Sequence, residues 1–178
     1  MDFSNPASEA AEHAGTYTRQ LLDLLGDRDA FDVQRELVPW LRDAIADMDE
    51  ESLRRREAPG QWSVMEVLGH LADTELVYRY RMRMSVAQPG SPIAGYDQDL
   101  WAAGLRYNED AVADVLAQIE FQRAANLAWV ERLTPDELSR AGIHAERGAE
   151  SVEHIVKLLA AHDLVHRAQI ERIKAAVL

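Results

Sequence analysis

The sequence contains no cysteine. This absence excludes disulfide bonds, thiolate metal ligands and a cysteine nucleophile. A metal ion bound by this chain must therefore be held by histidine, aspartate or glutamate side chains. Thiol chemistry, if the protein performs any, must use a thiol that arrives with the substrate.

Basic residues are scarce compared with acidic ones, with 19 Lys and Arg against 31 Asp and Glu and a net charge of −12. This balance argues against binding to a nucleic-acid backbone or to anionic lipid, because both need clustered positive charge. No stretch approaches the roughly 18 apolar residues of a membrane span, and residues 1–12 lack the pattern of a secretion signal. We therefore expect a cytoplasmic protein that binds neither nucleic acid nor membrane.

Strand signals are nearly absent, and helix signals dominate the 178 residues. The length suits one domain over residues 1–178, with residues 1–28 as an N-terminal helical extension in which Asn5-Pro6 opens a short helix. Four long helices are predicted over residues 29–48, 63–87, 108–133 and 151–178. The predicted fold class is an all-α four-helix bundle with long crossover connections.

Local signals define most of these boundaries. Ser63 and Glu66 form a capping box at the start of the second helix, and Asn108 is expected to cap the third. Pro39 should kink the first helix or mark a boundary in it. A second capping box at Thr134 opens a short helix, and residues 140–150 are expected to be loop. Residues 64–82 are apolar on much of their helical circumference, which indicates contacts on more than one side, either within the bundle or at a dimer interface. A homodimer is expected.

The most informative motif is the pair His162 and His166 in the last predicted helix. Residues four apart lie on one face of a helix, with Cβ atoms about 5–6 Å apart, so both rings can bind one metal ion. The pair occupies the same stripe as Ile155, Leu159 and Ile170, where core side chains are expected. A buried imidazole needs a partner, and a metal ion is one candidate.

Three further residues lie on the inner faces of the predicted helices. His70 is at the flank of the apolar stripe of the second helix, where a partly buried histidine without a metal is the simpler interpretation. Arg123 interrupts the apolar stripe of the third helix, and an internal ion pair is favoured over an anionic ligand. Arg81 shares the face of His70, and a salt bridge with Asp97 or Asp99 would account for it.

An ordered set of short motifs resembles the DinB/YfiT-like superfamily of metal-binding four-helix bundles. The resemblance covers residues 16–178, nearly the whole chain. The matching segments are Pro59-Gly60-Gln61-Trp62-Ser63-Val64, His70-Leu71-Ala72-Asp73, Arg79-Tyr80-Arg81, Gly95-Tyr96-Asp97, His144-Ala145-Glu146-Arg147-Gly148, the segment His162 to His166, and Gln169-Ile170.

The resemblance implies that His70, His162 and His166 bind a divalent metal ion, which reverses the simpler interpretation of His70. Three neutral imidazoles with open coordination positions are typical of a catalytic metal site. Zn²⁺ or Ni²⁺ fits these ligands best, with Fe²⁺ and Mn²⁺ as alternatives. Asp73 and Asp163 are near the ligands in sequence and are candidate acceptors for them, although solvated carboxylates are the simpler expectation. The sequence assigns no role to His144.

The resemblance also implies a function. Similar proteins transfer small molecules to a low-molecular-weight thiol of the bacillithiol or mycothiol type, so the sequence predicts a metal-dependent S-transferase. Arg123 or Arg81 would then hold the carboxylate of the thiol. The alternatives are a metal-dependent hydrolase and a non-catalytic metal-binding protein of the stress response.

Overall fold

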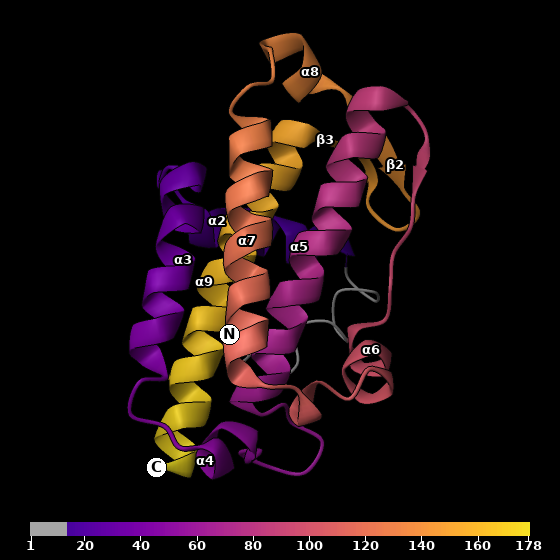
Figure 1. Cartoon of the computed structure of the whole chain (residues 1–178). Coiled ribbons are helices and arrows are strands. Elements are labelled where there is room, and N and C mark those ends of the chain that lie inside the picture. The colour runs from indigo at the N-terminus through magenta and orange to yellow at the C-terminus, as the bar shows by residue number, and fades with distance from the viewer. Residues whose placement is uncertain (1–13) are drawn as a thin grey trace.

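The computed structural model describes residues 14–178, so the short helix expected at Asn5-Pro6 lies outside the described residues. Four long helices form the body of the molecule (Figure 1). This arrangement confirms the predicted all-α four-helix bundle. The four are α3 (Ala30–Ala44), α5 (Val64–Ala87), α7 (Val112–Val130) and α9 (Val152–Val177).

The bundle is closed, because α3 packs on α9, α9 on α5, α5 on α7 and α7 on α3. Helices α5 and α7 run in the same direction, so the chain must return along the bundle between them (Figure 1). This crossover carries strand β1 (Pro92–Ile93), helix α6 (Gln98–Gly104) and the short 3₁₀ helix η1 (Tyr107–Glu109). The expected long crossover is therefore present.

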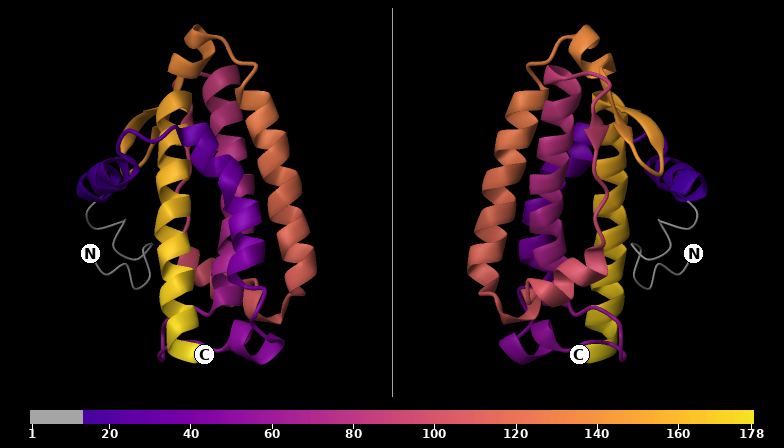
Figure 2. Two further views of the ribbon diagram at one scale, coloured as in Figure 1. Left: turned by 90° about the vertical axis from the view of Figure 1, so that its left-hand side faces the viewer. Right: turned by 90° about the vertical axis from the view of Figure 1, so that its right-hand side faces the viewer.

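Shorter elements surround the bundle. Helix α4 (Glu50–Arg54) lies in the segment between α3 and α5, and α8 (Pro135–Ser139) precedes the hairpin that leads into α9. Helix α2 (Ala14–Leu25) packs against the outside of α9. Figure 2 shows α2 and the β2–β3 hairpin projecting from the same side of the bundle. That side contains the cleft described below.

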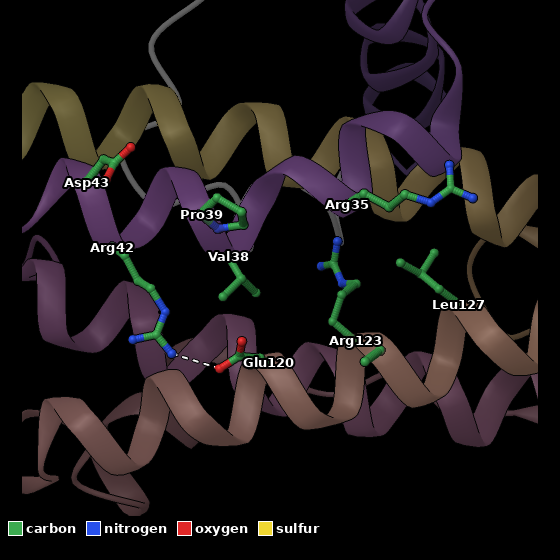
Figure 3. Close-up of a pocket in the computed structure, with 9 residues that line it drawn as sticks. Arg35, Val38, Pro39, Arg42, Asp43, Glu120, Arg123 and Leu127 are labelled. Carbon is green, nitrogen blue, oxygen red and sulfur yellow. Dashed lines mark hydrogen bonds and ion pairs between the residues drawn. The ribbon is translucent and has the colours of Figure 1, made fainter.

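The capping signals explain why the long helices begin where they do. The Ser63 hydroxyl accepts from the Glu66 amide at 3.1 Å, and the Glu66 carboxylate accepts from the Ser63 amide at 2.8 Å, as the capping box predicts. Asp29 caps α3 in a similar way. Pro39 lies inside α3 without ending it, as Figure 3 shows.

The prediction that Asn108 caps the third long helix is wrong. Asn108 lies in η1, and α7 begins four residues later, after Ala111, without a side-chain cap. The Asn108 amide is used in tertiary contacts instead: it accepts from the Ser63 hydroxyl at 2.7 Å and donates to the Arg54 carbonyl at 3.0 Å. Asn108 thereby ties η1 to the start of α5.

The prediction of loop over residues 140–150 is also wrong. Strands β2 (Ala141–His144) and β3 (Gly148–Ser151) form an antiparallel hairpin, and β1 pairs in parallel with β2. The turn ends at Gly148, whose φ of +78° favours glycine. Strands of two to four residues have too little alternation to be detected in a sequence. These short strands are stabilised by tertiary contacts instead, because β1 pairs with β2 and β2 packs against α5.

The largest core cluster fills the space between α3, α5, α7 and α9, and Leu37, Leu41, Leu68 and Ile119 are among its fully buried members. On α5 the apolar surface is divided: Val64, Met65 and Leu71 are buried, whereas Leu76 and Tyr80 are exposed. Within residues 14–178, no helix combines the length and apolar character that crossing a bilayer requires.

Candidate metal centre

Three buried imidazoles meet between α5 and α9. His70 is on α5, and His162 and His166 lie one turn apart on α9. The Nε2 atom of His162 is 3.0 Å from Nε2 of His70 and 3.0 Å from Nε2 of His166. All three candidate ligand atoms lie within 4.8 Å of one another. The three histidines predicted from the sequence are thus brought together at one point.

Burial keeps these rings in their neutral form. It lowers the pKa of His70 and of His162 well below the ordinary value, and it lowers the pKa of His166 to about 4. The neighbouring rings add to this effect at His70 and His162, because a proton on one disfavours a proton on the next. Neutral imidazole is the form that binds a metal ion.

Gln169 fixes the orientation of one ring. Its side-chain carbonyl oxygen accepts a hydrogen bond from Nδ1 of His166 at 2.7 Å. The proton of His166 is therefore on Nδ1, and its Nε2 presents a lone pair toward His162. Such a hydrogen bond is the usual support of a metal-binding histidine. The motif Gln169-Ile170 contained this residue, but the sequence alone did not assign it a role.

Trp62 covers the site from the start of α5. Its ring centroid lies 5.1 Å from that of His70 and 6.4 Å from that of His166, and it is almost parallel to the His166 ring. The indole is buried and its Nε1 donates to Asp99 at 3.0 Å. Trp62 therefore connects the histidines to helix α6 and shields them on this side.

A cleft of about 590 Å³ leads to His162 from the side of α2 and the β2–β3 hairpin. It is lined by residues from five segments of the chain: Tyr17, Leu21, Tyr78, Arg81, Gly95, Tyr96, Asp97, Gln98, Asp99, His144, Glu146, Arg147 and His162. His162 is one of the residues that line this cleft, and most of the others are polar. A small molecule can therefore reach the candidate metal centre from this direction.

Arg81 lies in this cleft, but the expected salt bridge is wrong. Among the described residues, no carboxylate is within 4.0 Å of its guanidinium. The group donates to the Ala94 carbonyl at 2.7 Å and lies near the rings of Tyr78 and Tyr96. Only 3% of Arg81 is exposed, so it is a buried cation with no carboxylate of the described residues within 4.0 Å.

Arg123 does not line this cleft. It lies between α5, α7 and α9, where it contacts Glu75 at 2.5 Å and Asp163 at 2.5 Å. The internal ion pair favoured by the sequence is therefore confirmed. The two carboxylates raise the pKa of the Arg123 guanidinium even though burial opposes its charge.

Asp73 and Asp163 were expected either to accept hydrogen bonds from the ligands or to be solvated, and neither does so. Asp163 is fully buried against Arg123 instead of solvated, and Asp73 accepts from the Tyr107 hydroxyl at 2.5 Å. Across residues 14–178, none of the three histidine rings has a carboxylate hydrogen-bond partner. The side chains that contact the rings are Thr74, Gln169 and Trp62.

A second hollow of about 590 Å³ lies between α3 and α7 (Figure 3). Its cations already have protein partners: Arg42 contacts Glu120 at 2.7 Å, and Arg123 reaches the carboxylates described above. Arg35 is likewise paired, with Asp32 and Glu131. Among the described residues, the group that could hold a metal ion is formed by the three histidines, and none of them lines this groove.

The structure adds residues that the sequence did not single out, namely Trp62, Tyr78, Tyr96, His144 and Arg147 around the cleft. Most of them belong to the matching motifs, so the motifs were the available signal. Their convergence depends on the crossover and on the hairpin, which the sequence did not reveal.

A mostly helical bundle with a buried group of three histidines defines a class of metal-binding helical proteins. The model of the DinB superfamily matches residues 12–170, and the chain belongs to this superfamily. YfiT from Bacillus subtilis, described as "a probable metal-dependent hydrolase with an unusual four-helix bundle topology", has a similar structure. Its TM-score is 0.75 at 20% identity, with coverage of 90% of this chain and 87% of YfiT.

Relatives from other bacteria agree with this assignment. A protein of Oceanobacillus iheyensis is 27% identical over 135 residues, which are 76% of this chain and 78% of the relative. A protein of Bacillus licheniformis is 28% identical over 150 residues, which are 78% and 85% of the two chains. Both carry the name "putative metal-dependent hydrolase".

Proposed function

We propose that this protein is a metal-dependent hydrolase in which His70, His162 and His166 bind one divalent ion. The observation that carries the proposal is the convergence of three Nε2 atoms in a buried site that opens into a cleft. The names of the relatives in Oceanobacillus and Bacillus support the hydrolytic reaction.

A shared cation explains the close contacts among the three rings better than hydrogen bonds between the rings do. Nε2 of His166 presents a lone pair because its Nδ1 donates to Gln169. In a neutral ring, Nε2 of His162 is either a donor or an acceptor, so it cannot accept from His70 and donate to His166 at the same time. At least one of these contacts at 3.0 Å is therefore not a hydrogen bond. A shared divalent ion would satisfy all three lone pairs at once.

A divalent ion held by three imidazoles lowers the pKa of water and polarises a carbonyl group. The chain contributes the rest of the environment. Gln169 holds the His166 ring in one orientation, the Trp62 ring stacks on that of His166, and Arg81 places one positive charge in the cleft. Zn²⁺ and Ni²⁺ are the ions we expect, because neutral nitrogen ligands suit both.

Thiol transfer is a second candidate, and one observation favours it. Over the described part of the chain, no carboxylate contacts the three rings, and the acids of the cleft, Asp97, Asp99 and Glu146, lie on its walls. A thiol has a pKa near 8.5 and needs less help than water to become a nucleophile. The cysteine-free chain would act on a thiol that is supplied from outside.

Metal content is the first test. After exposure to Zn²⁺ or Ni²⁺ and removal of free ions, elemental analysis should find about one equivalent per chain. The double variant His162→Ala/His166→Ala should hold none. His154→Ala is the matched control, since His154 lies on the same helix but outside the group of three, and it should keep the full equivalent. Wild-type protein without metal after this treatment would refute the proposal.

Activity then separates the two reactions. The metal-loaded protein is assayed with a panel of esters and amides, and with an electrophile in the presence of a thiol. Turnover of the esters or amides without a thiol, lost in the double variant, supports hydrolysis. Turnover that requires the thiol would replace hydrolysis with S-transfer while leaving the metal site in place.

A further inference from the structure

Two buried hydrogen-bond donors in the cleft have no partner among the described residues. Arg81 Nε and His144 Nε2 are both buried and unpaired. The residues themselves are 3% and 2% exposed, and both line the cleft that reaches His162. A buried donor without an acceptor costs about 1–3 kcal/mol. Two such donors in one cleft therefore point to a ligand that accepts hydrogen bonds from both.

The protonation of His144 follows from its contacts. Its Nδ1 accepts from the backbone amide of Glu146 at 3.3 Å, so the proton is on Nε2 and the ring is a donor toward the cleft. Strand β2 holds the ring in place by pairing with Ile93 of β1. A Cβ at position 95 would lie 3.7 Å from Nε2, which is an ordinary contact distance. Because residue 95 is glycine, this side of the nitrogen stays uncovered.

The charge of the cleft limits the ligand. Arg147 also lines it, but its guanidinium is paired with Glu150 at 2.5 Å. Asp97, Asp99 and Glu146 add negative charge to the same walls. Arg81 is thus the cation of the cleft that has no carboxylate within 4.0 Å in the described chain. One cation and one neutral donor suit a planar monoanion better than a dianion such as a phosphate monoester.

The position of Tyr78 relates this pair of donors to the histidines. Its ring centroid lies 6.5 Å from that of His162 and 5.2 Å from Cζ of Arg81. One aromatic side chain therefore separates the candidate metal centre from the guanidinium. A ligand that reaches both needs its anionic group a few bonds away from the group that meets the metal.

We propose that Arg81 and His144 form a carboxylate-binding subsite and that the substrate is a small carboxylic acid whose reacting group lies a few bonds from its carboxylate. For a hydrolase, this describes an ester or amide with a free carboxylate. The inference rests on the proposed metal site, because the second end of the ligand is placed by the metal.

The test uses Co²⁺-loaded protein and two probes with the same spacing between thiol and carboxyl carbon, 3-mercaptopropionate and its uncharged methyl ester. The thiol serves as a handle for the metal, and its binding is followed by the thiolate-to-cobalt absorption. The chain has no cysteine, so the probe is the only source of thiolate. The carboxylate probe should bind at least about tenfold more tightly than the ester.

Three variants assign the preference to the subsite. Arg81→Met should bring the two dissociation constants within about twofold of each other, without changing the value for the ester. His144→Phe should reduce the preference. Gly95→Ala should also reduce it, because the new methyl group lies against the His144 ring at ordinary contact distance. Arg83→Met is the matched control on the exposed side of α5 and should keep the wild-type preference.

Two outcomes would overturn the proposal, and they are distinguishable. If wild-type protein binds cobalt but holds the acid and the ester equally, the subsite is refuted and the metal site stands. If no cobalt binds, the metal site fails and the subsite fails with it. Arg81→Met is expected to fold, since it removes a buried charge that has no carboxylate within 4.0 Å in the described residues.

Discussion

Arg81 and Arg123 are both buried arginines on neighbouring helices, but their surroundings differ. Arg123 has two carboxylates at 2.5 Å and also donates to the Gln34 carbonyl at 3.1 Å. Arg81 has one backbone carbonyl and two aromatic rings. A buried charge with protein partners supports the fold, whereas one without them is available to a ligand.

The first residue-scale prediction concerns the ion pairs of Arg123. Arg123→Met leaves Glu75 and Asp163 buried without a cation, which should lower the free energy of unfolding by about 3–5 kcal/mol. The measurement is urea unfolding at pH 7. Arg42→Met is the control, because the pair of Arg42 with Glu120 is half exposed and should contribute little. Equal stability of the Arg123 variant and wild type would contradict the structural role.

Gly69 gives a prediction about how α5 meets η1. An added Cβ at Gly69 would lie 2.5 Å from Cγ of the Tyr107 ring, which is itself held by Asp73. Gly69→Ala should therefore destabilise the protein by about 1–3 kcal/mol through overpacking, despite the better helix propensity of alanine.

Gly104→Ala is the comparison for Gly69, since an added Cβ at Gly104 has no neighbour within 4 Å. Thermal melting of the two variants measures the difference. If Gly69→Ala were as stable as Gly104→Ala, the close packing of Tyr107 on α5 would be wrong. The double variant Gly69→Ala/Tyr107→Leu should recover part of the loss by removing the ring.

At the scale of elements, the sequence predicted what regular periodicity and capping encode. The long helices are found where the stripes and the Ser63 capping box placed them, and the spacing of His162 and His166 was enough to pair two of the three rings. His70 lies beside these two rings because α5 packs against α9 in the bundle.

The elements that escaped prediction are those stabilised by tertiary contacts. The hairpin of residues 141–151 has strands too short for a recognisable pattern, and Asn108 serves tertiary hydrogen bonds instead of a helix cap. His144 lies in this hairpin, so its place in the cleft could not be predicted from the sequence. The missing salt bridge of Arg81 depended on the path of the crossover, which local patterns do not determine.

At the scale of the whole molecule, burial of the histidines should make stability depend on pH. In the metal-free protein their folded-state pKa values lie below the ordinary value of 6.5, with His166 at about 4. The unfolded chain therefore binds more protons than the folded one as pH falls below 6.5. Each of the three should remove up to about 1.4 kcal/mol per pH unit in that range, until its folded form also takes up a proton.

Urea unfolding of the metal-free protein between pH 7.5 and pH 4.5 measures this slope. His166→Gln should flatten it, because one of the protons taken up on unfolding is lost. His154→Gln keeps all three buried rings and should retain a steeper slope than His166→Gln. If the slope of His166→Gln were the same as that of wild type, the buried neutral state of this ring would be refuted.

The candidate ligands and the walls of the cleft come from different parts of the architecture. The three histidines are on two helices of the tightly packed bundle, whereas Tyr17, Tyr96 and His144 come from α2, the crossover and the hairpin at its side (Figure 2). The apolar side chains of these segments pack on the bundle, as Leu21 of α2 and Ile93 of β1 do, whereas Tyr17 and Tyr96 are only partly buried and face the cleft. Directed evolution of ligand preference can therefore be confined to the peripheral segments, with the bundle left unchanged as a scaffold.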